Sequence, residues 1–109
     1  MKVISNATQE LLTQLKLCAM PMPILEYKFH PERKWRMDMA YIEEKIAIEI
    51  HGAVYTQGRH TRGKGFINDR EKMNEAQLLD WIVLEITQEH ITKGLAVQWI
   101  EKALELRTL

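Results

Sequence analysis

The spacing of apolar and polar residues predicts an N-terminal helix. Apolar residues recur at helical intervals from about Ser5 to Leu17. Ser5 or Asn6 is placed to cap that helix. Pro21 and Pro23 follow and favour an extended stretch. The pattern then changes from helical to strand-like spacing.

Three strand-like segments follow, Ile24–Phe29, Trp35–Tyr41 and Lys45–His51. A loop from Gly52 to Gly65 comes next and contains four of the five glycines. These features predict three consecutive strands that end in a glycine-rich loop.

The second half of the chain predicts a helix, a strand and a helix. Asn68 to Glu71 fits an Asn-x-x-Glu capping box, so a helix is expected from Asn68 to about Asp80. Trp81–Ile86 suits a buried strand, and Thr87 would cap a last helix that ends near Leu106. The whole chain, residues 1–109, is therefore expected to be one α/β domain, a mixed sheet flanked by helices in the order α-β-β-β-α-β-α.

Composition narrows the class of protein. Hydrophobic content of 46% with 28% charged residues is typical of a soluble globular protein. The single cysteine, Cys18, excludes an internal disulfide and zinc sites built on cysteine pairs, and it is expected in the core. No N-terminal apolar stretch is long enough for a signal or membrane helix. We therefore expect a cytoplasmic protein with no membrane association.

The hairpin between Trp35 and His51 predicts an opposed pair of acids. If its turn is centred on the two glutamates 43 and 44, Asp38 faces Glu49, with Cβ atoms about 4.5–5.5 Å apart. Alternation would put both acids on one face with Ala40 and Ala47, leaving room for a substrate. The other face is expected to be apolar, formed by Trp35, Met37, Met39, Ile46, Ile48 and Ile50.

Two opposed carboxylates predict a metal site. They repel, and burial raises the pKa of at least one of them. Mg²⁺ or Mn²⁺ would remove that penalty, because hard cations prefer oxygen ligands. Arg36 and His51 extend the same row with groups that suit phosphate. The alternative is that Asp38 and Glu49 are ordinary residues of a solvated sheet face.

The glycine-rich loop suits phosphate binding. Although the net charge is zero, every charged residue from Arg59 to Lys64 is positive, and His60 lies among them. Glycines let the backbone N–H groups approach an anion, and arginine and lysine neutralise it. Arg59, His60, Arg62 and Lys64 are therefore predicted to bind nucleic acid. An HNH nuclease would need its histidine on a hairpin leading into a helix, and the strands here lie too far upstream.

The stretch from Glu26 to Ile86 resembles the PD-(D/E)XK, or restriction-endonuclease-like, nuclease superfamily. The resemblance is carried by Asp38, by Glu49-Ile50-His51 and by the run GRHTRGKGF with the following Asn68 and Asp69. More narrowly, it is similar to small phage-type members related to very-short-patch-repair endonucleases. The resemblance implies a metal-dependent phosphodiester hydrolase acting on DNA.

Carried over by position, Asp38 and Glu49 become metal ligands, with Glu26 as an additional acid. His51 stands where the superfamily usually has lysine. Lys72, in the following helix, could swing toward the acids and supply that charge, leaving His51 to orient water or contact phosphate. Glu85 stands where relatives often carry a basic residue.

A chain of this size has little surface for reading a long DNA sequence. We therefore expect a homodimer that acts on DNA structure, as a Holliday-junction resolvase or nickase does, in the host cytoplasm if phage-encoded. The dimer contact is expected on the apolar positions of the last helix, namely Ile91, Leu95, Val97, Ile100 and Leu104. The rival function is a non-catalytic nucleic-acid-binding or assembly module that keeps the fold.

Overall fold

A mixed four-stranded sheet forms the centre of the computed structural model, which describes residues 4–52 and 63–109. The strands are β1 (Ile24–Lys28), β2 (Arg36–Tyr41), β3 (Ile46–His51) and β4 (Ile82–Thr87), in the spatial order β1-β2-β3-β4. The first two neighbouring pairs are antiparallel, whereas β3 and β4 are parallel. A parallel pair needs a crossover connection, and the helix α2 (Lys64–Leu78) lies on that connection.

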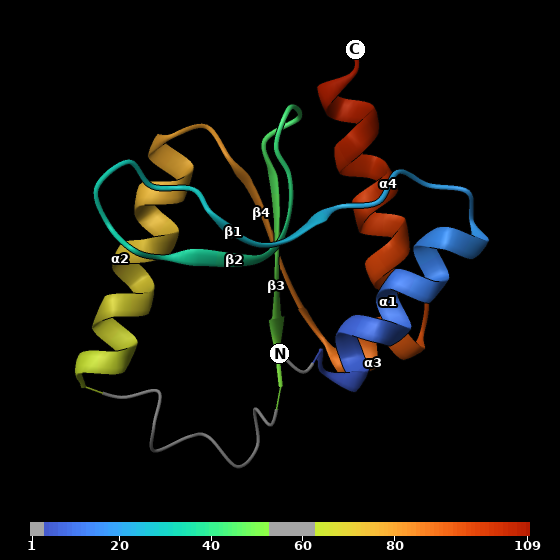
Figure 1. Ribbon diagram of the computed structural model, residues 1–109, viewed down its shortest axis with the longest axis horizontal. Coiled ribbons are helices and arrows are strands. Elements are labelled where there is room, and N and C mark those ends of the chain that lie inside the picture. Colours follow the sequence, from blue (N-terminus) through green and yellow to red (C-terminus); the bar gives the residue numbers. More distant parts are fainter. Residues whose placement is uncertain (1–3, 53–62) are drawn as a thin grey trace.

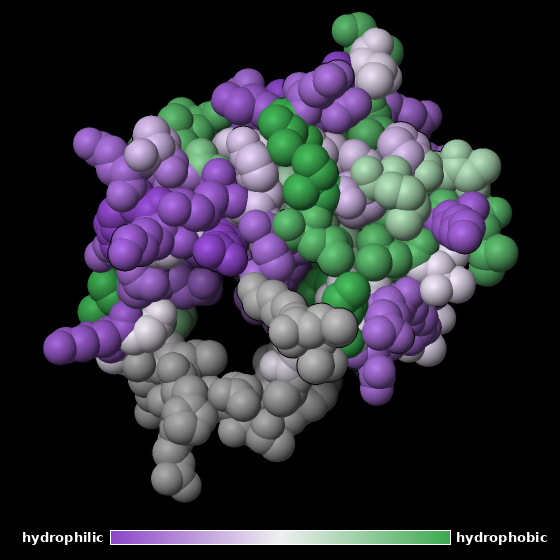
Figure 2. Space-filling view, viewed as in Figure 1, coloured by the Kyte–Doolittle hydropathy of each residue, from purple (hydrophilic) through white to green (hydrophobic). Residues whose placement is uncertain are grey.

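Helices cover both faces of the sheet. Helix α2 lies on one side, and α1 (Asn6–Leu17), α3 (Gln88–Thr92) and α4 (Leu95–Arg107) lie on the other (Figure 1). In the same view, hydrophilic residues gather over the α2 side of the molecule (Figure 2). The predicted α/β class, with a mixed sheet flanked by helices, is confirmed.

Two hydrophobic cores stabilise the two sides. The larger core packs α1, α3 and α4 against β2, β3 and β4, with Leu11, Leu15, Met39, Ile48 and Ile100 fully buried. The second core lies under α2 and is built largely from aromatic side chains. Its buried members are Phe29, Trp35, Met37, Ala40, Ala47, Ala76 and Trp81.

The predicted hairpin register is confirmed. Tyr41 pairs with Ile46, Ala40 with Ala47 and Met39 with Ile48. The prediction for the two faces was partly wrong. Met37 and Trp35 belong to the core under α2, on the opposite side of the sheet from Met39.

The reason is a break in side-chain alternation. Met37 and Met39 are two residues apart, which would put them on one face of a regular strand, yet they enter different cores. Their partners on β1 are Tyr27 and Leu25, and between these lies Glu26, with a φ of 54°. A left-handed residue in a strand rotates the backbone locally, so the β1–β2 ribbon changes faces at Glu26 and Asp38.

The two alanines do not leave room for a substrate. Ala40 and Ala47 are fully buried and pack in the core with Ala76 of α2. Their small side chains instead allow α2 to lie close to the sheet. This proximity is what lets α2 reach the acids.

Two helix boundaries differ from the prediction. Helix α2 begins at Lys64 after Gly63, which has a φ of 66°, and not at Asn68. The Asn68 carboxamide does not cap the helix because its oxygen accepts hydrogen bonds from Trp35 Nε1 and from Arg33, each at 3.3 Å. Thr87 does cap a helix, but that helix is the short α3. Gly94, with a φ of 81°, separates it from α4.

The apolar residues of the predicted last helix pack largely into the core of their own chain. Ile91 of α3 and Ile100 of α4 are fully buried, and Leu95, Val97 and Leu104 of α4 are partly buried. Leu95, Val97 and Leu104 keep part of their surface accessible, and the dimer contact expected on part of this helix stays a prediction. Cys18 is exposed, contrary to expectation, because it lies beyond the end of α1. In the described part of the chain, no helix is long and apolar enough to cross a membrane.

Candidate active site

Asp38 and Glu49 lie where β2 and β3 stop pairing through their backbones. The backbone ladder ends at Met39 and Ile48, and the acids are the next residues in that register. The Asp38 amide donates to Glu49 Oε2 at 3.2 Å, and the Ile50 amide donates to Asp38 Oδ2 at 2.7 Å. Each carboxylate therefore accepts a hydrogen bond from an amide of the opposite strand, as a backbone carbonyl would in a regular ladder. This hydrogen bond fixes the orientation of the carboxylate.

The two side chains approach this junction from opposite sides of the sheet. Asp38 lines a cavity of about 570 Å³ on the α1 side. Glu49 is buried on the α2 side, where its Oε1 forms an ion pair with Lys72. The opposed pair that the sequence predicts is thus present, but the carboxylates do not lie on one open face.

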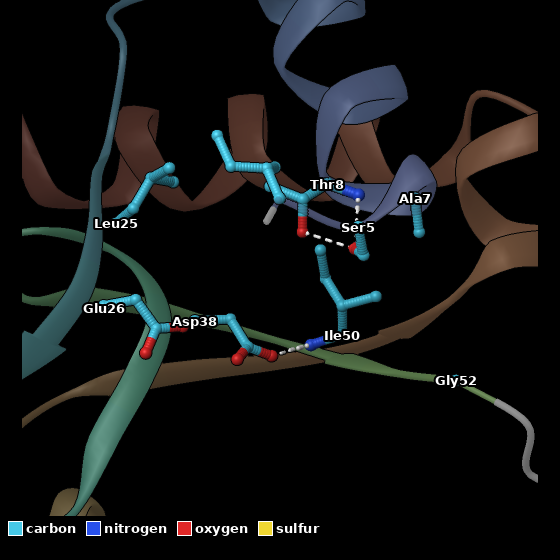
Figure 3. A pocket seen from close by; sticks show the side chains of 9 residues that line it. Ser5, Ala7, Thr8, Leu25, Glu26, Asp38, Ile50 and Gly52 are labelled. Atoms are coloured by element: carbon cyan, nitrogen blue, oxygen red, sulfur yellow. Dashed lines mark hydrogen bonds between the residues drawn. The ribbon is translucent and has the colours of Figure 1, made fainter. Parts of the chain in front are cut away.

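The cavity is walled by the start of α1 and by the sheet. Its lining includes Ser5, Thr8, Leu25, Glu26 and Ile50 beside Asp38. Figure 3 shows the Asp38 carboxylate directed at the Ile50 amide, below the first turn of α1. Ser5 caps that turn, since its Oγ accepts from the Thr8 amide at 3.2 Å. Sequence reasoning did not find this wall, because no local signal links Ser5 with Asp38.

Burial strongly perturbs Glu49. Its side chain is only 8% exposed, and burial is the main reason that its pKa is raised to about 7. The charge of Asp38 also raises this pKa, whereas the hydrogen bond from Lys72 lowers it. Burial thus favours the protonated form of Glu49, and a nearby cation would favour its ionised form.

Lys72 reaches Glu49 from α2, in agreement with the expectation that this lysine could supply the charge missing at position 51. Its side chain is 14% exposed, and its Nζ contacts Glu49. The third turn of α2 thus contributes a cation to a site otherwise made of acids from β2 and β3. The ordinary alternative, a surface ion pair within α2, does not describe this lysine.

His51 lies two residues beyond Glu49 and points to β4. Its Nε2 is 3.0 Å from Glu85 Oε1, and both side chains are partly exposed. The Glu85 position, where relatives often carry a basic residue, thus contacts His51 in this chain. No contact joins His51 to Asp38 among the described residues.

Glu26 shares the cavity with Asp38 but completes no ligand cluster. Within residues 4–52 and 63–109, no three acidic, histidine or cysteine side chains converge closely enough to hold a metal ion. The expected set of Glu26, Asp38 and Glu49 is therefore not assembled as three converging ligands. Asp38 and Glu49 remain as the two candidate metal ligands.

The predicted phosphate-binding residues are only partly described. Arg36 is exposed at the start of β2, and Lys64 is exposed at the start of α2. Arg59, His60 and Arg62 lie outside the described residues.

No family model matches the chain, and no curated protein matches it. Among solved structures, the fold is similar to that of the catalytic domain of the homing endonuclease I-Bth0305I, with a TM-score of 0.59. The two chains are 22% identical, and the match covers 93% of this chain and 92% of the other. The similarity extends over nearly the whole domain and establishes the fold as one that a nuclease domain uses.

Proposed function

We propose that the protein is a metal-dependent endonuclease that hydrolyses phosphodiester bonds of DNA. The observation that carries the proposal is the junction of Asp38 and Glu49 on neighbouring strands, with Glu49 paired to Lys72 from α2. The similarity in fold to a homing endonuclease catalytic domain supports it. The resemblance to the PD-(D/E)XK superfamily and its very-short-patch-repair branch agrees with this arrangement.

The donor set fits Mg²⁺ or Mn²⁺. Asp38 and Glu49 offer carboxylate oxygens, the ligands that hard cations prefer. Burial raises the pKa of Glu49 even beside Lys72, and a divalent ion at the pair would favour the ionised carboxylate. Glu26 would support the metal from the other wall of the cavity. When bound, such an ion lowers the pKa of a water molecule and stabilises charge on the phosphate.

The remaining roles belong to the protein's own residues. The amides of Asp38 and Ile50 hold the two carboxylates in place before any ligand arrives, which limits reorganisation during the reaction. Lys72 would stabilise negative charge that develops near Glu49. His51, held by Glu85, would orient water or contact phosphate.

The DNA is proposed to be held by Arg36, Lys64 and the basic loop with Arg59, His60 and Arg62. We further propose a structure-specific activity of the nickase or Holliday-junction resolvase type, exerted by a homodimer. The partly buried residues Leu95, Val97 and Leu104 of α4 would contribute to the dimer contact.

A cleavage assay tests the proposal directly. Purified protein is incubated with supercoiled plasmid and with a four-way junction, in Mg²⁺, in Mn²⁺ or in EDTA. We expect nicking or junction cleavage that requires the metal and is lost in Asp38→Asn. Salt-sensitive DNA binding without cleavage under every metal condition would refute the nuclease and favour the binding module.

A further inference from the structure

The face of the β1–β2 ribbon that carries Asp38 continues away from the cavity. Met37 is fully buried in the core under α2, and its neighbours on either side are Arg36 and Asp38. Because adjacent strand residues point to opposite faces, Arg36 and Asp38 both project away from α2. Arg36 is exposed, whereas Asp38 enters the cavity.

Lys28 occupies the matching position on β1. It pairs directly with Arg36 in the antiparallel register, and it is exposed. Its neighbour Tyr27 packs with the core under α2, so Lys28 projects to the same side as Arg36. Directly paired side chains lie about 5 Å apart at Cβ, so the two cations form one compact positive site.

The charged groups of the turn between β1 and β2 do not cancel this pair. In the turn between the strands, Glu32 and Lys34 are both exposed and have opposite charges. Arg33 is directed toward α2, where its guanidinium stacks on Trp35 at 3.8 Å and contacts Glu71 at 3.5 Å. On the Asp38 side of the ribbon, Lys28 and Arg36 are therefore the cations next to Glu26 and Asp38, the two acids that line the cavity.

We infer that Lys28 and Arg36 together bind a backbone phosphate of the nucleic acid, next to the phosphate that would lie at Asp38. Two strand residues span about 7 Å, comparable with one nucleotide step of an extended strand. The acids of the cavity repel a polyanion, and a cationic pair beside them offsets that repulsion. The substrate strand then runs along the β1–β2 ribbon from the cavity toward the turn.

This inference rests on the proposed function for its ligand, and it adds Lys28 and a direction for the strand. Phosphate contacts of this kind position the nucleic acid without reading its sequence. The pair is therefore expected to act equally on oligonucleotides of different sequence.

A salt titration tests the inference. The affinity of the full chain for a fluorescently labelled oligonucleotide, single-stranded or duplex, is measured in EDTA over a series of salt concentrations. The double variant Lys28→Ala/Arg36→Ala should flatten the dependence of log affinity on log salt by about 0.7 for a single strand or about 0.9 for a duplex, since the two cations together neutralise one phosphate. The form whose slope changes by its own expected amount is the form bound on the ribbon.

The matched control is Lys16→Ala. Lys16 is an exposed cation in the last turn of α1, about 15 Å along the helix from the turn that borders the cavity. We expect its slope to match the wild type. A wild-type slope in the double variant, or an equal loss in Lys16→Ala, would overturn the inference. Circular dichroism confirms that each variant is folded, and Lys28→Gln/Arg36→Gln repeats the test if the alanines unfold the chain.

The outcome is separable from that of the cleavage assay. A flatter salt dependence in the double variant, without cleavage in any metal, would support the binding site and refute the nuclease. Metal-dependent cleavage by the wild type, with an unchanged salt dependence in the double variant, would support the nuclease and refute the Lys28–Arg36 site.

Discussion

Lys72, in α2, and Glu49, in β3, form an ion pair in which both side chains are largely buried. The two residues are 23 positions apart, and the crossover between β3 and β4 brings them together. A cation is thus built into the acidic junction from outside the Glu49-Ile50-His51 tripeptide.

Removing this cation should slow cleavage without weakening DNA binding. If Lys72 stabilises charge in the transition state, Lys72→Ala should reduce the single-turnover rate at least about a hundredfold, the lower end for a positioned catalytic group. Lys72→Arg should retain part of the rate because it retains the charge. His51→Ala should reduce the cleavage rate less than Lys72→Ala does. A wild-type rate in Lys72→Ala would leave His51 as the candidate.

Neutralising either acid should abolish cleavage but preserve the fold. Asp38→Asn and Glu49→Gln each keep an oxygen that accepts the amide hydrogen bond from the opposite strand. We expect cleavage to fall at least about a thousandfold, equivalent to several kcal/mol of lost metal stabilisation. Asp38→Ala, which also removes the acceptor for the Ile50 amide, should in addition lose about 1 kcal/mol of unfolding free energy. Full activity in both neutral variants would contradict the site.

The metal-free protein should lose stability as the pH rises toward 8. The pKa of Glu49 is about 7 in the folded state and 4.5 ordinarily, so the folded state holds a proton that the unfolded state has released. Its contribution is complete below the ordinary pKa and is lost as the pH rises through 7, amounting to at most about 3 kcal/mol.

Urea unfolding in EDTA between about pH 5 and pH 8 measures this contribution, since stability is linked to the difference in bound protons. Mg²⁺ should restore more stability at the higher pH, because it competes with the proton for Glu49. Glu49→Gln should flatten the dependence. A wild-type profile in that variant would assign the dependence to another group.

Gly94 should tolerate substitution poorly for conformational reasons alone. Its φ is 81°, and a Cβ built there meets no atom within 4 Å. Gly94→Ala should therefore cost about 1–2 kcal/mol of unfolding free energy through the left-handed conformation, without a steric clash. Gly94→Asn should cost less, because asparagine adopts this conformation more easily. Thermal unfolding compares the two, and equal stabilities would refute the conformational explanation.

Local sequence patterns predicted the elements and the hairpin register. The two glutamates at the turn were enough to pair Ala40 with Ala47 and to bring Asp38 opposite Glu49. Regular alternation failed at Asp38 because Glu26 takes a left-handed conformation, which nothing in its own side chain predicts. The capping box at Asn68 failed because Trp35 and Arg33, distant in sequence, occupy that side chain.

The arrangement of the residues around the site was less predictable from the sequence than the identity of its two acids. Lys72 could be proposed from its place in the following helix, but its contact with Glu49 depends on how closely α2 packs on Ala40 and Ala47. The cavity wall formed by Ser5 and Thr8 depends on where α1 lies relative to β2. Such long-range packing leaves no periodic signal in the sequence.

The parallel pairing of β3 with β4 has a consequence for the order of folding. The β2–β3 hairpin joins residues close in sequence, such as Tyr41 and Ile46, whereas Ile46 and Ile82 must meet across 36 positions. Contacts between residues distant in sequence form more slowly because a long loop must close first. The hairpin with Asp38 and Glu49 can therefore form early, as two repelling acids without their cation. Lys72 joins them only when the crossover closes, so catalytic competence would appear in the last step of folding and not with the first secondary structure.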